Sequence, residues 1–391
     1  MDIQQTGIIT LVKSALTGKK SDLPEGFDIE QAEKCAAKHR ISSLLYYGAL
    51  NCGINENSPV MQRLFFNTCR YLQINECQTF SLAELLAEFE KNSVCYMLLK
   101  GANLKKMYPK PEMRPMGDVD ILIKTEQYDV IKPIMQSLGY NEVVESDHEY
   151  VWDKHGVHVE LHKRLIPSYN KDYYSYFGDG WQLAHPVLDA RYYAMKPEDE
   201  FIYLFTHFAK HYRDAGIGIK HAVDLWVFSK RIKLDDGYLK KELEKLQLYV
   251  FYKNIMHTLS VWFEGETASA TDEFITSIIF GSGVYGTYEA HLLSMALKGV
   301  KSEGSAKKAH RKRLLHLAFL PYDAMCTRYP VLCKAAVLLP VFWIVRWFDV
   351  LLFKTERIKR NQEELKITTT EKVDEYQKAL NFVGLDYNFK E

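Results

Sequence analysis

Three acidic residues in two short segments have the spacing needed to bind divalent cations. Asp118 and Asp120 lie in segment 117–123, and Glu160 lies in segment 157–162; polar and apolar residues alternate in both. A β-strand points every second side chain to the same face, so each segment would present its acidic residues on one face and its apolar residues on the other. If the two strands pair, three carboxylates converge above a hydrophobic core. Carboxylates placed in this way can hold divalent cations against a triphosphate.

Histidines beside Glu160 leave a second metal chemistry open. His158, Glu160 and His162 share one face of the expected strand, and His148 lies in the segment before it. Two imidazoles and one carboxylate on a strand face form a ligand set that zinc accepts. The spacing is not that of the helical His-Glu-x-x-His zinc motif, because the glutamate position and the alternation differ.

Basic and glycine residues precede the acidic strand at an expected strand-to-helix turn. Lys100 and Gly101 follow the apolar segment 94–99. Backbone N–H groups at such a turn can face phosphate oxygens, and glycine permits a close approach. Arg114 could contact a β- or γ-phosphate with its planar guanidinium. The alternative for Arg114 is a surface position in a loop that contains Pro109, Pro111 and Pro115.

These segments resemble a known family. The matching strings are Leu99-Lys100-Gly101, Tyr108-Pro109, Arg114, Gly117-Asp118-Val119-Asp120 and Val159-Glu160-Leu161-His162. They resemble the large bacterial family of uncharacterised nucleotidyltransferases and, more broadly, the nucleotidyltransferase superfamily of the DNA polymerase β type. The strong likeness covers residues 95–163, and a weaker likeness, which includes residues 37–46, runs from about residue 30 to 230. The chain departs from the superfamily at the turn, where the usual Gly-Ser or Gly-Gly is Gly101-Ala102 and the gap to Asp118 is longer.

The resemblance implies roles for particular residues. The residues implied to bind metal, as two Mg²⁺ or Mn²⁺ ions, are Asp118, Asp120 and Glu160. The residues implied to contact the nucleotide phosphates are Lys100, Gly101, Arg114 and Gly117. Residues that would orient Glu160 or contact substrate are His148, His158, His162, His207, Lys220 and Asp224. Lys220 and Asp224 are expected on one helix face, where the alternative is an ordinary ion pair.

Composition indicates an ordinary globular protein. The chain has 391 residues, and its 50 basic and 50 acidic residues give a formal charge of zero. This balance argues mildly against a long nucleic-acid track. The seven cysteines include no Cys-x-x-Cys pair, and the first residues lack a basic-then-apolar signal pattern. We therefore expect reduced thiols and a cytoplasmic location.

Hydrophobic patterning predicts an α+β fold, with a small mixed-sheet core embedded in helical N- and C-terminal regions. The resemblance implies that this core is a nucleotidyltransferase core. The expected regions are a helical region over 1–92, the core over 93–166, a helical domain over 167–300, and a basic linker with helices over 301–391. Within the core, strands are expected at 94–99, 117–123, 140–153 and 156–165. Helices are expected over 104–108 and 125–138 in the core, and over 29–50, 198–212 and 219–232 outside it.

One uncharged apolar stretch lies near the C-terminus. Residues 335–345 are interrupted by Pro340 and are too short to span a bilayer, which requires about 20 apolar residues, so we expect no transmembrane segment. Basic residues flank the stretch at 307–313 and 354–360. Two interpretations stay open: a buried helix pair with solvated ends, or a weak contact with an anionic membrane surface through residues 331–360.

The leading hypothesis is a Mg²⁺-dependent nucleotidyltransferase. It would move a nucleoside monophosphate from an NTP donor to a hydroxyl of an acceptor, which could be a small molecule, a protein or an RNA end. One alternative is a catalytically silent nucleotide-binding or regulatory protein of the same fold. A third hypothesis is a zinc-dependent hydrolase that uses His158, Glu160 and His162.

Overall fold

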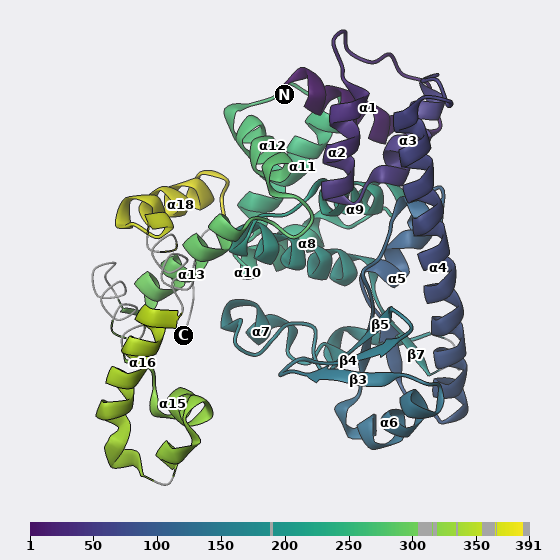
Figure 1. Ribbon diagram of the computed structural model, residues 1–391. Helices are drawn as coiled ribbons and strands as arrows, with labels where there is room; N and C mark the ends of the chain where they lie inside the picture. The colour runs from purple at the N-terminus through teal and green to yellow at the C-terminus, as the bar shows by residue number, and fades with distance from the viewer. Residues whose placement is uncertain are drawn as a thin grey trace. The chain divides into compact units, whose positions relative to one another are not determined.

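The acidic segments lie in a seven-stranded sheet with the order β3-β4-β5-β2-β1-β7-β6 (Figure 1). The computed structural model describes residues 1–187, 191–303, 315, 319–333, 335–353, 364 and 366–385. The strands are β1 (Tyr96–Leu98), β2 (Asp118–Ile123), β3 (Asn141–Glu145), β4 (Glu149–Lys154), β5 (Val157–His162), β6 (Ala184–Pro186) and β7 (Tyr192–Met195). β2 pairs with β5, and β1 with β7, in parallel; the other neighbours are antiparallel, so the sheet is mixed.

Helices precede, interrupt and follow the strands. Before the sheet come α1 (Ile3–Thr17), α2 (Ile29–His39), α3 (Ser42–Asn51) and α4 (Pro59–Lys91). Between strands lie α5 (Gly101–Leu104), α6 (Tyr128–Ser137) and α7 (Lys171–Phe177). The later helices are α8 (Pro197–Asp214), α9 (Ile219–Arg231), α10 (Asp236–Lys245), α11 (Tyr249–Glu264), α12 (Ala270–Ser282), α13 (Tyr288–Glu303), α15 (Tyr322–Arg328), α16 (Leu339–Phe353) and α18 (Thr370–Phe382). The predicted α+β class, a mixed-sheet core with helical flanks, is confirmed.

The described residues form two compact units. One comprises Met1–Tyr212, Gly216–Gly286 and Val383–Lys390, and it contains the whole sheet and every candidate site residue. The other comprises Arg213–Ala215 and Thr287–Phe382, with the final residue of the chain. The division into four regions drawn from the sequence stays a prediction.

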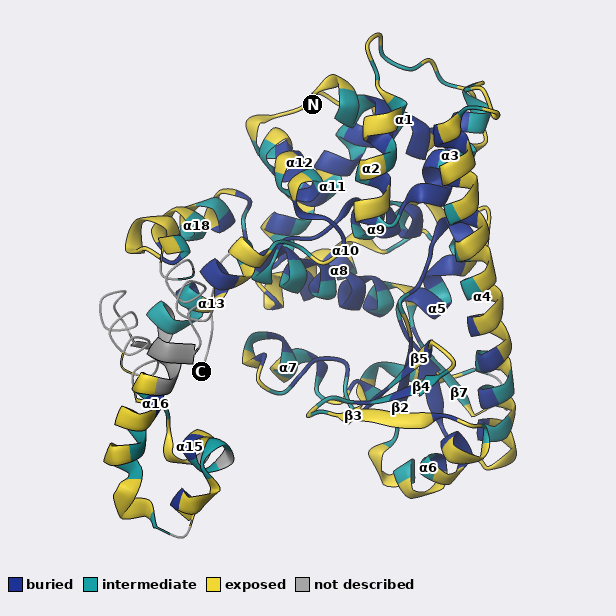
Figure 2. Ribbon diagram, viewed as in Figure 1, coloured by how far each residue is buried: buried dark blue, intermediate teal, exposed yellow. Residues whose placement is uncertain are grey.

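One face of the sheet is covered by the end of α4 and by α6 and forms a hydrophobic core. Val119 and Ile121 of β2, with Val159 and Leu161 of β5, point into this core and are buried. Trp152 of β4 packs in the same cluster. Figure 2 shows the contrast between these buried strands and the edge strand β3, whose five residues are all exposed. The alternation in β2 and β5 therefore leaves their acidic side chains on the opposite face.

The segment expected as one helix over 29–50 is two helices that meet at Arg40. Arg40 has a left-handed backbone (φ 53, ψ 42), and the N–H of Ile41 donates to the carbonyl of Ala36 at 2.9 Å. This is the hydrogen-bond pattern of a helix C-terminal cap. The cap turns the chain so that α3 starts in a new direction at Ser42.

Two expectations for the sheet are wrong. Residues 140–153 form a hairpin of β3 and β4 instead of one strand. The turn is made by Ser146, whose N–H donates to the Glu149 carbonyl and whose Oγ accepts from the N–H groups of His148 and Glu149. The turn contains neither glycine nor proline, but five consecutive polar residues, 145–149, interrupt the alternation there. β6 and β7 were also missed, because both are short and β7 pairs with the distant β1.

The apolar stretch near the C-terminus belongs partly to α16. Val341, Ile344, Val345 and Phe348 of α16 are exposed apolar side chains. This exposure differs from the buried helix pair of the first interpretation. The flanking basic residues at 307–313 and 354–360 lie outside the described residues, so membrane-surface contact stays a prediction. None of the described helices is long and apolar enough to cross a membrane.

Replacing Trp152 tests whether the core behind β2 and β5 is the main support of these strands. Trp152 is 0 % exposed, and its indole N–H has no hydrogen-bond partner among the residues that the structure describes. We expect Trp152→Ala to lower the free energy of unfolding by about 3–5 kcal/mol, because it leaves a cavity. Urea unfolding followed by far-UV circular dichroism measures the loss. Trp152→Phe keeps a ring and removes the unpartnered donor, so it should cost clearly less; equal losses would contradict this account.

Candidate active site

The parallel pairing of β2 with β5 brings the acidic residues together. In this register Asp120 lies opposite Glu160, and Asp118 lies opposite His158. Side chains at paired positions point to the same face of a sheet. Asp118, Asp120 and Glu160 therefore share the face that points away from the hydrophobic core, as the alternation in the sequence predicts.

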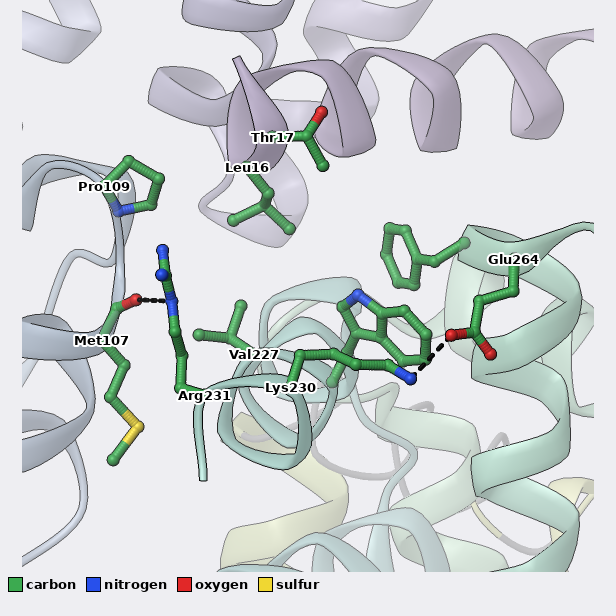
Figure 3. A pocket seen from close by; sticks show the side chains of 10 residues that line it. Leu16, Thr17, Met107, Pro109, Val227, Lys230, Arg231 and Glu264 are labelled. Atoms are coloured by element: carbon green, nitrogen blue, oxygen red, sulfur yellow. Dashed lines mark hydrogen bonds and ion pairs between the residues drawn. The ribbon is translucent and has the colours of Figure 1, made fainter. Parts of the chain in front are cut away.

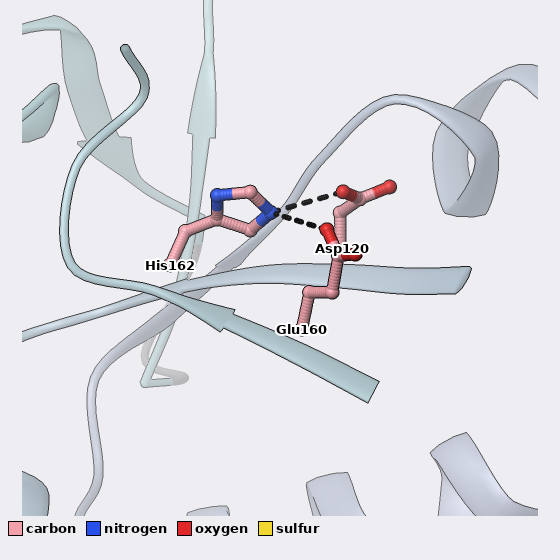
Figure 4. Close-up of side chains that lie close together, drawn as sticks. All are labelled: Asp120, Glu160 and His162. Carbon is pink, nitrogen blue, oxygen red and sulfur yellow. Dashed lines mark hydrogen bonds and ion pairs between the residues drawn. The ribbon is translucent and has the colours of Figure 1, made fainter. Parts of the chain in front are cut away.

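Asp120, Glu160 and His162 form a cluster that could hold a metal ion (Figure 4). One ligand atom of each lies within 4.8 Å of the others. His162 Nε2 is 2.9 Å from Asp120 Oδ1 and 3.3 Å from Glu160 Oε2. Carboxylate oxygens suit Mg²⁺ and Mn²⁺, whereas the imidazole would also suit zinc.

Lys100, which lies at the turn between β1 and α5, forms an ion pair with Asp120 of the cluster. Its Nζ lies 2.8 Å from Asp120 Oδ1. The Lys100 backbone has φ 44 and ψ −114, a positive-φ conformation that costs a residue with a Cβ of order 1–3 kcal/mol. Strain of this kind persists only where the surrounding structure enforces it, and it is concentrated at functional sites.

The charges of the cluster shift one another's pKa. Burial alone would raise the pKa of Asp120, but Lys100 and the hydrogen bond to His162 outweigh burial and hold it well below its usual value. Burial raises the pKa of Glu160, and the charge of Asp120 adds to that rise. Burial and Lys100 oppose protonation of His162, yet its contacts with Asp120 and Glu160 raise its pKa. The pKa values of the neighbouring carboxylates Asp120 and Glu160 are thus shifted in opposite directions.

Asp118 lies outside the cluster but lines the same cleft. Its side chain is exposed, and partial loss of hydration together with repulsion from Asp120 raises its pKa. No ion pair of Asp118 is present among the described residues, whereas Asp120 is held by Lys100 and His162. The cleft therefore has one carboxylate held by ion pairs, Asp120, and one exposed carboxylate, Asp118, without such contacts among the described residues.

The cleft has a volume of about 330 Å³, at the small end of the range for ligand pockets. The carboxylates line it on the sheet side. Helical elements supply the other side, here called the helical side, with the residues Arg40, Leu204, His207, Phe208, His211, Lys220, His221, Asp224, Leu225, Val284 and Tyr285. The candidates that line the cleft are Lys100, Gly101, Arg114, Gly117, Asp118, Asp120, Glu160, His207, Lys220 and Asp224.

Arg114 is buried and pairs with Asp224, the residue that the sequence placed on one helix face with Lys220. Its Nε and Nη2 donate to the two oxygens of Asp224 at 3.1 and 2.9 Å, and Tyr108 donates to Asp224 at 2.7 Å. The alternative of a surface position for Arg114 is wrong, and no ion pair between Lys220 and Asp224 is present among the described residues. This network joins α9 to the loop before β2.

The structure gives a reason for glycine at position 101. A Cβ there would lie 2.4 Å from Arg114 Nη1 and 2.8 Å from Met116 Sδ, so a side chain would displace Arg114. Gly117 is less constrained: a Cβ would meet Arg40 Nη1 at 3.6 Å, an ordinary contact. Close packing of Arg114 therefore requires Gly101, whereas Gly117 lines the cleft without such a need.

The candidate histidines separate into different environments. His158 is exposed and its Nδ1 lies 3.3 Å from Asp153 Oδ2; the metal-competent cluster contains Asp120 in place of His158. His148 Nε2 lies 3.0 Å from Glu149 Oε2, beside the cluster. His207 lines the cleft, and burial lowers its pKa well below the usual value.

Sequence reasoning did not identify the cleft residues Arg40, His221 and Tyr285. They lie on helices and loops far from the acidic strands in the chain, where no spacing rule connects them to the site. A signal for Arg40 was present in the weak likeness over residues 37–46. Its left-handed cap, which directs the side chain, is not visible in the helical periodicity.

A second pocket of about 270 Å³ is lined in part by residues 226, 227, 230 and 231 of α9 (Figure 3). Trp226, Phe263 and Val227 form an apolar part of its lining. Lys230 Nζ pairs with Glu264 at 2.6 Å, and Arg231 Nε donates to the Met107 carbonyl at 3.1 Å. Its single carboxylate is thus neutralised, and it offers no cluster for metal chemistry.

Comparisons with known proteins identify the family of the chain. The solution structure of the antibiotic-resistance factor ANT(2'')-Ia covers 49% of this chain and 100% of its own, at 11% identity and a TM-score of 0.33, a likeness too low to support an argument. No curated protein matches the chain. The sequence model of the family described as "uncharacterised nucleotidyltransferase" matches residues 25–264, which is more than half of the chain and includes both acidic strands and α9. The chain therefore belongs to this nucleotidyltransferase family.

Proposed function

We propose that the protein is a metal-dependent nucleotidyltransferase that moves a nucleoside monophosphate from an NTP to a hydroxyl group. The observation that carries this proposal is the register of β2 and β5, which places Asp120 opposite Glu160 in one cleft with Asp118. Family membership supports the same reaction class. A charged, buried carboxylate pair is costly without a cation, because like charges repel strongly where water is scarce.

The metal ligands under this proposal are Asp118, Asp120 and Glu160, and the ions are Mg²⁺ or Mn²⁺. The fit rests on oxygen-rich ligands, on the 4.8 Å grouping around Asp120, and on the exposed carboxylate of Asp118 nearby. When bound, two such ions, typically about 3.5–4 Å apart, supply positive charge to the attacking and leaving oxygens.

The chain's own residues would orient the reactants. Lys100 holds Asp120 through a 2.8 Å contact, and His162 contacts both Asp120 and Glu160. In the reaction, the acceptor oxygen bonds to the α-phosphorus while the bond to the bridging oxygen breaks and pyrophosphate leaves. Glu160 lies on the acceptor side and takes up the hydroxyl proton. Lys100, Gly101, Arg114 and Gly117 lie on the phosphate side.

The acceptor in this proposal is a hydroxyl of a small molecule, a protein or an RNA end. A zinc-dependent hydrolase is a second candidate, favoured by the imidazole of His162 beside Glu160 and Asp120. A silent nucleotide-binding protein is the third, favoured by the unusual Gly101-Ala102 turn. Metal analysis distinguishes the transferase from the zinc hydrolase, and nucleotide binding tests the proposed use of an NTP.

Nucleotide binding tests the proposal. Each of the four NTPs with Mg²⁺ is added to the full chain, and the melting temperature is recorded. A ligand that binds only the folded state stabilises it by about 2.7 kcal/mol at 100 times its Kd. We expect at least one NTP to raise the melting temperature in a Mg²⁺-dependent way, and the double variant Asp118→Asn/Asp120→Asn to lose this shift.

The control is Asp153→Asn, which removes a carboxylate of the same sheet that pairs with His158 outside the cluster; its shift should match the wild type. Because Asp120→Asn leaves buried Lys100 without its partner, Lys100→Met/Asp120→Asn provides a variant in which both charges are removed. An unchanged shift in folded variants without Asp118 and Asp120 charges would contradict the metal assignment.

Metal content distinguishes transferase from zinc hydrolase. We expect purified protein to contain no stoichiometric zinc and to bind Mn²⁺ weakly and reversibly, because three carboxylates favour hard cations. Elemental analysis and Mn²⁺ electron paramagnetic resonance measure the two. Glu160→Gln should weaken Mn²⁺ binding. One tightly held zinc per chain, lost in His162→Ala, would favour the hydrolase instead.

A further inference from the structure

Two cations on the helical side of the cleft have no carboxylate partner among the described residues. Lys220 is 6 % exposed, and its Nζ has the Pro115 carbonyl, at 3.4 Å, as its hydrogen-bond acceptor. The Arg40 guanidinium lies 5.0 Å from the centre of the Tyr285 ring. Both side chains line the cleft that contains the carboxylates. A buried ammonium with one weak acceptor lacks the compensation that such charges ordinarily have.

The other cations of the cleft are already neutralised. Lys100 contacts Asp120 at 2.8 Å, and Arg114 contacts Asp224 at 2.9 Å. Each of these ion pairs holds its cation in place and neutralises its charge, so neither cation is left to pair with a bound anion. The uncompensated positive charge of the cleft is therefore that of Arg40 and Lys220.

A dedicated set of contacts positions these two cations. His39 is buried, and its ring joins three elements: Nδ1 accepts from the Ile219 N–H at 3.2 Å, and Nε2 lies 3.1 Å from the Phe280 carbonyl. Lys220 follows Ile219 directly, and Arg40 follows His39. The α2 end, the start of α9 and the end of α12 are thus fixed against one another around the cleft.

Lys38 extends this attachment to Tyr285. Its Nζ donates to the Gly281 carbonyl at 2.6 Å, and its own carbonyl accepts from the Val284 N–H at 3.2 Å. Tyr285 is 73 % exposed and is held where Arg40 lies over its ring. The segment Lys38-His39-Arg40 therefore fixes the position of both cations and of the aromatic ring beside them.

Two histidines of the helical side, His207 and His221, add no positive charge. Burial lowers the pKa of His207 and His221 well below the usual value, so both carry no charge at neutral pH. Burial, and then repulsion from Arg114, lowers the pKa of Lys220 to about 7. An anion beside Lys220 would relieve this penalty and favour its charged form.

We propose that Arg40 and Lys220 bind the polyphosphate tail of the donor nucleotide. This inference rests on the proposed function and specifies which residues hold the β- and γ-phosphates on the side opposite the metal ligands. Arginine offers planar, paired N–H donors to phosphate oxygens, and lysine offers a compact charge. A tail between the carboxylate-bound cations and these two side chains meets positive charge from both sides.

The arrangement has a consequence for ligand choice. A nucleoside monophosphate has no tail to reach both cations, whereas tripolyphosphate has the tail without a nucleoside. Both free tripolyphosphate and an NTP should therefore bind through Arg40 and Lys220. Comparing the two distinguishes binding of the tail from binding of the nucleoside.

The test is isothermal titration calorimetry of the full chain with Mg²⁺ and, separately, sodium tripolyphosphate, AMP, ATP, GTP, CTP and UTP. We expect tripolyphosphate and at least one NTP to bind, and AMP to bind at least tenfold more weakly than ATP. Arg40→Ala and Lys220→Met should each weaken tripolyphosphate binding at least tenfold. Lys230→Met, which changes a lysine of α9 in the second pocket, should stay within twofold of the wild type.

Mn²⁺ binding provides the second measurement. Arg40→Ala and Lys220→Met should bind Mn²⁺ as the wild type does, because the carboxylates are unchanged; loss of both Mn²⁺ and tripolyphosphate would mean a general structural effect and would overturn the inference. Lys220→Arg retains the charge and should retain binding, which covers the case in which Lys220→Met does not fold.

Two negative outcomes are distinguishable. If the wild type binds an NTP and tripolyphosphate and the two variants bind them equally well, the inference is wrong and the proposed function stands. If the folded wild type binds neither an NTP nor tripolyphosphate, the proposed function is wrong and the inference is wrong with it.

Discussion

Repulsion among carboxylates is the constraint on which the site depends. β2 and β5 place Asp118, Asp120 and Glu160 on one face of the sheet, and a buried cluster of like charges is unstable unless cations compensate it. Lys100 and His162 supply compensation from within the chain, through contacts of 2.8 and 2.9 Å to Asp120. The strained backbone at Lys100 and the glycine beside it follow from this need, because they bring the ammonium to the carboxylate and leave room for Arg114.

The opposite side of the cleft is organised by a neutral residue. His39 carries no charge at neutral pH, since burial lowers its pKa to about 4, and it acts through hydrogen bonds to the backbone of α9 and α12. A positively charged side chain at this position would repel the guanidinium of the adjacent Arg40. A neutral ring can instead join three helical elements while the charges face the cleft.

Local periodicity was enough to predict the strand faces. The period of a strand is two, so the alternation around Asp118 and Glu160 determines which side chains share a face without reference to the rest of the chain. The fold class followed from the same patterns together with the resemblance. The hairpin turn at Ser146 was missed, although five consecutive polar residues, 145–149, interrupt the alternation there. Its geometry depends on side-chain hydrogen bonds, which strand periodicity does not describe.

Contacts between distant segments explain the other omissions. β7 pairs with β1 across almost a hundred residues of chain, and Arg40 reaches the cleft through a left-handed cap. Hydrophobic periodicity along a segment predicts neither the pairing of β7 with β1 nor the position of the Arg40 side chain. The partners of Arg114 show the same limit: a loop position suggested a surface arginine, but Asp224 of α9 buries it.

The parallel pairing of β1 with β7 also affects how the protein is made. A nascent chain that has reached β5 already contains every acidic ligand, yet it lacks β7, α9 and the segment that carries Tyr285. Closing such long loops is slow, and domains generally fold as units during synthesis. Arg40 and Lys100 therefore emerge from the ribosome before the acidic strands, whereas Lys220 and Tyr285 emerge after them. The cleft is complete only after residue 285 has been added.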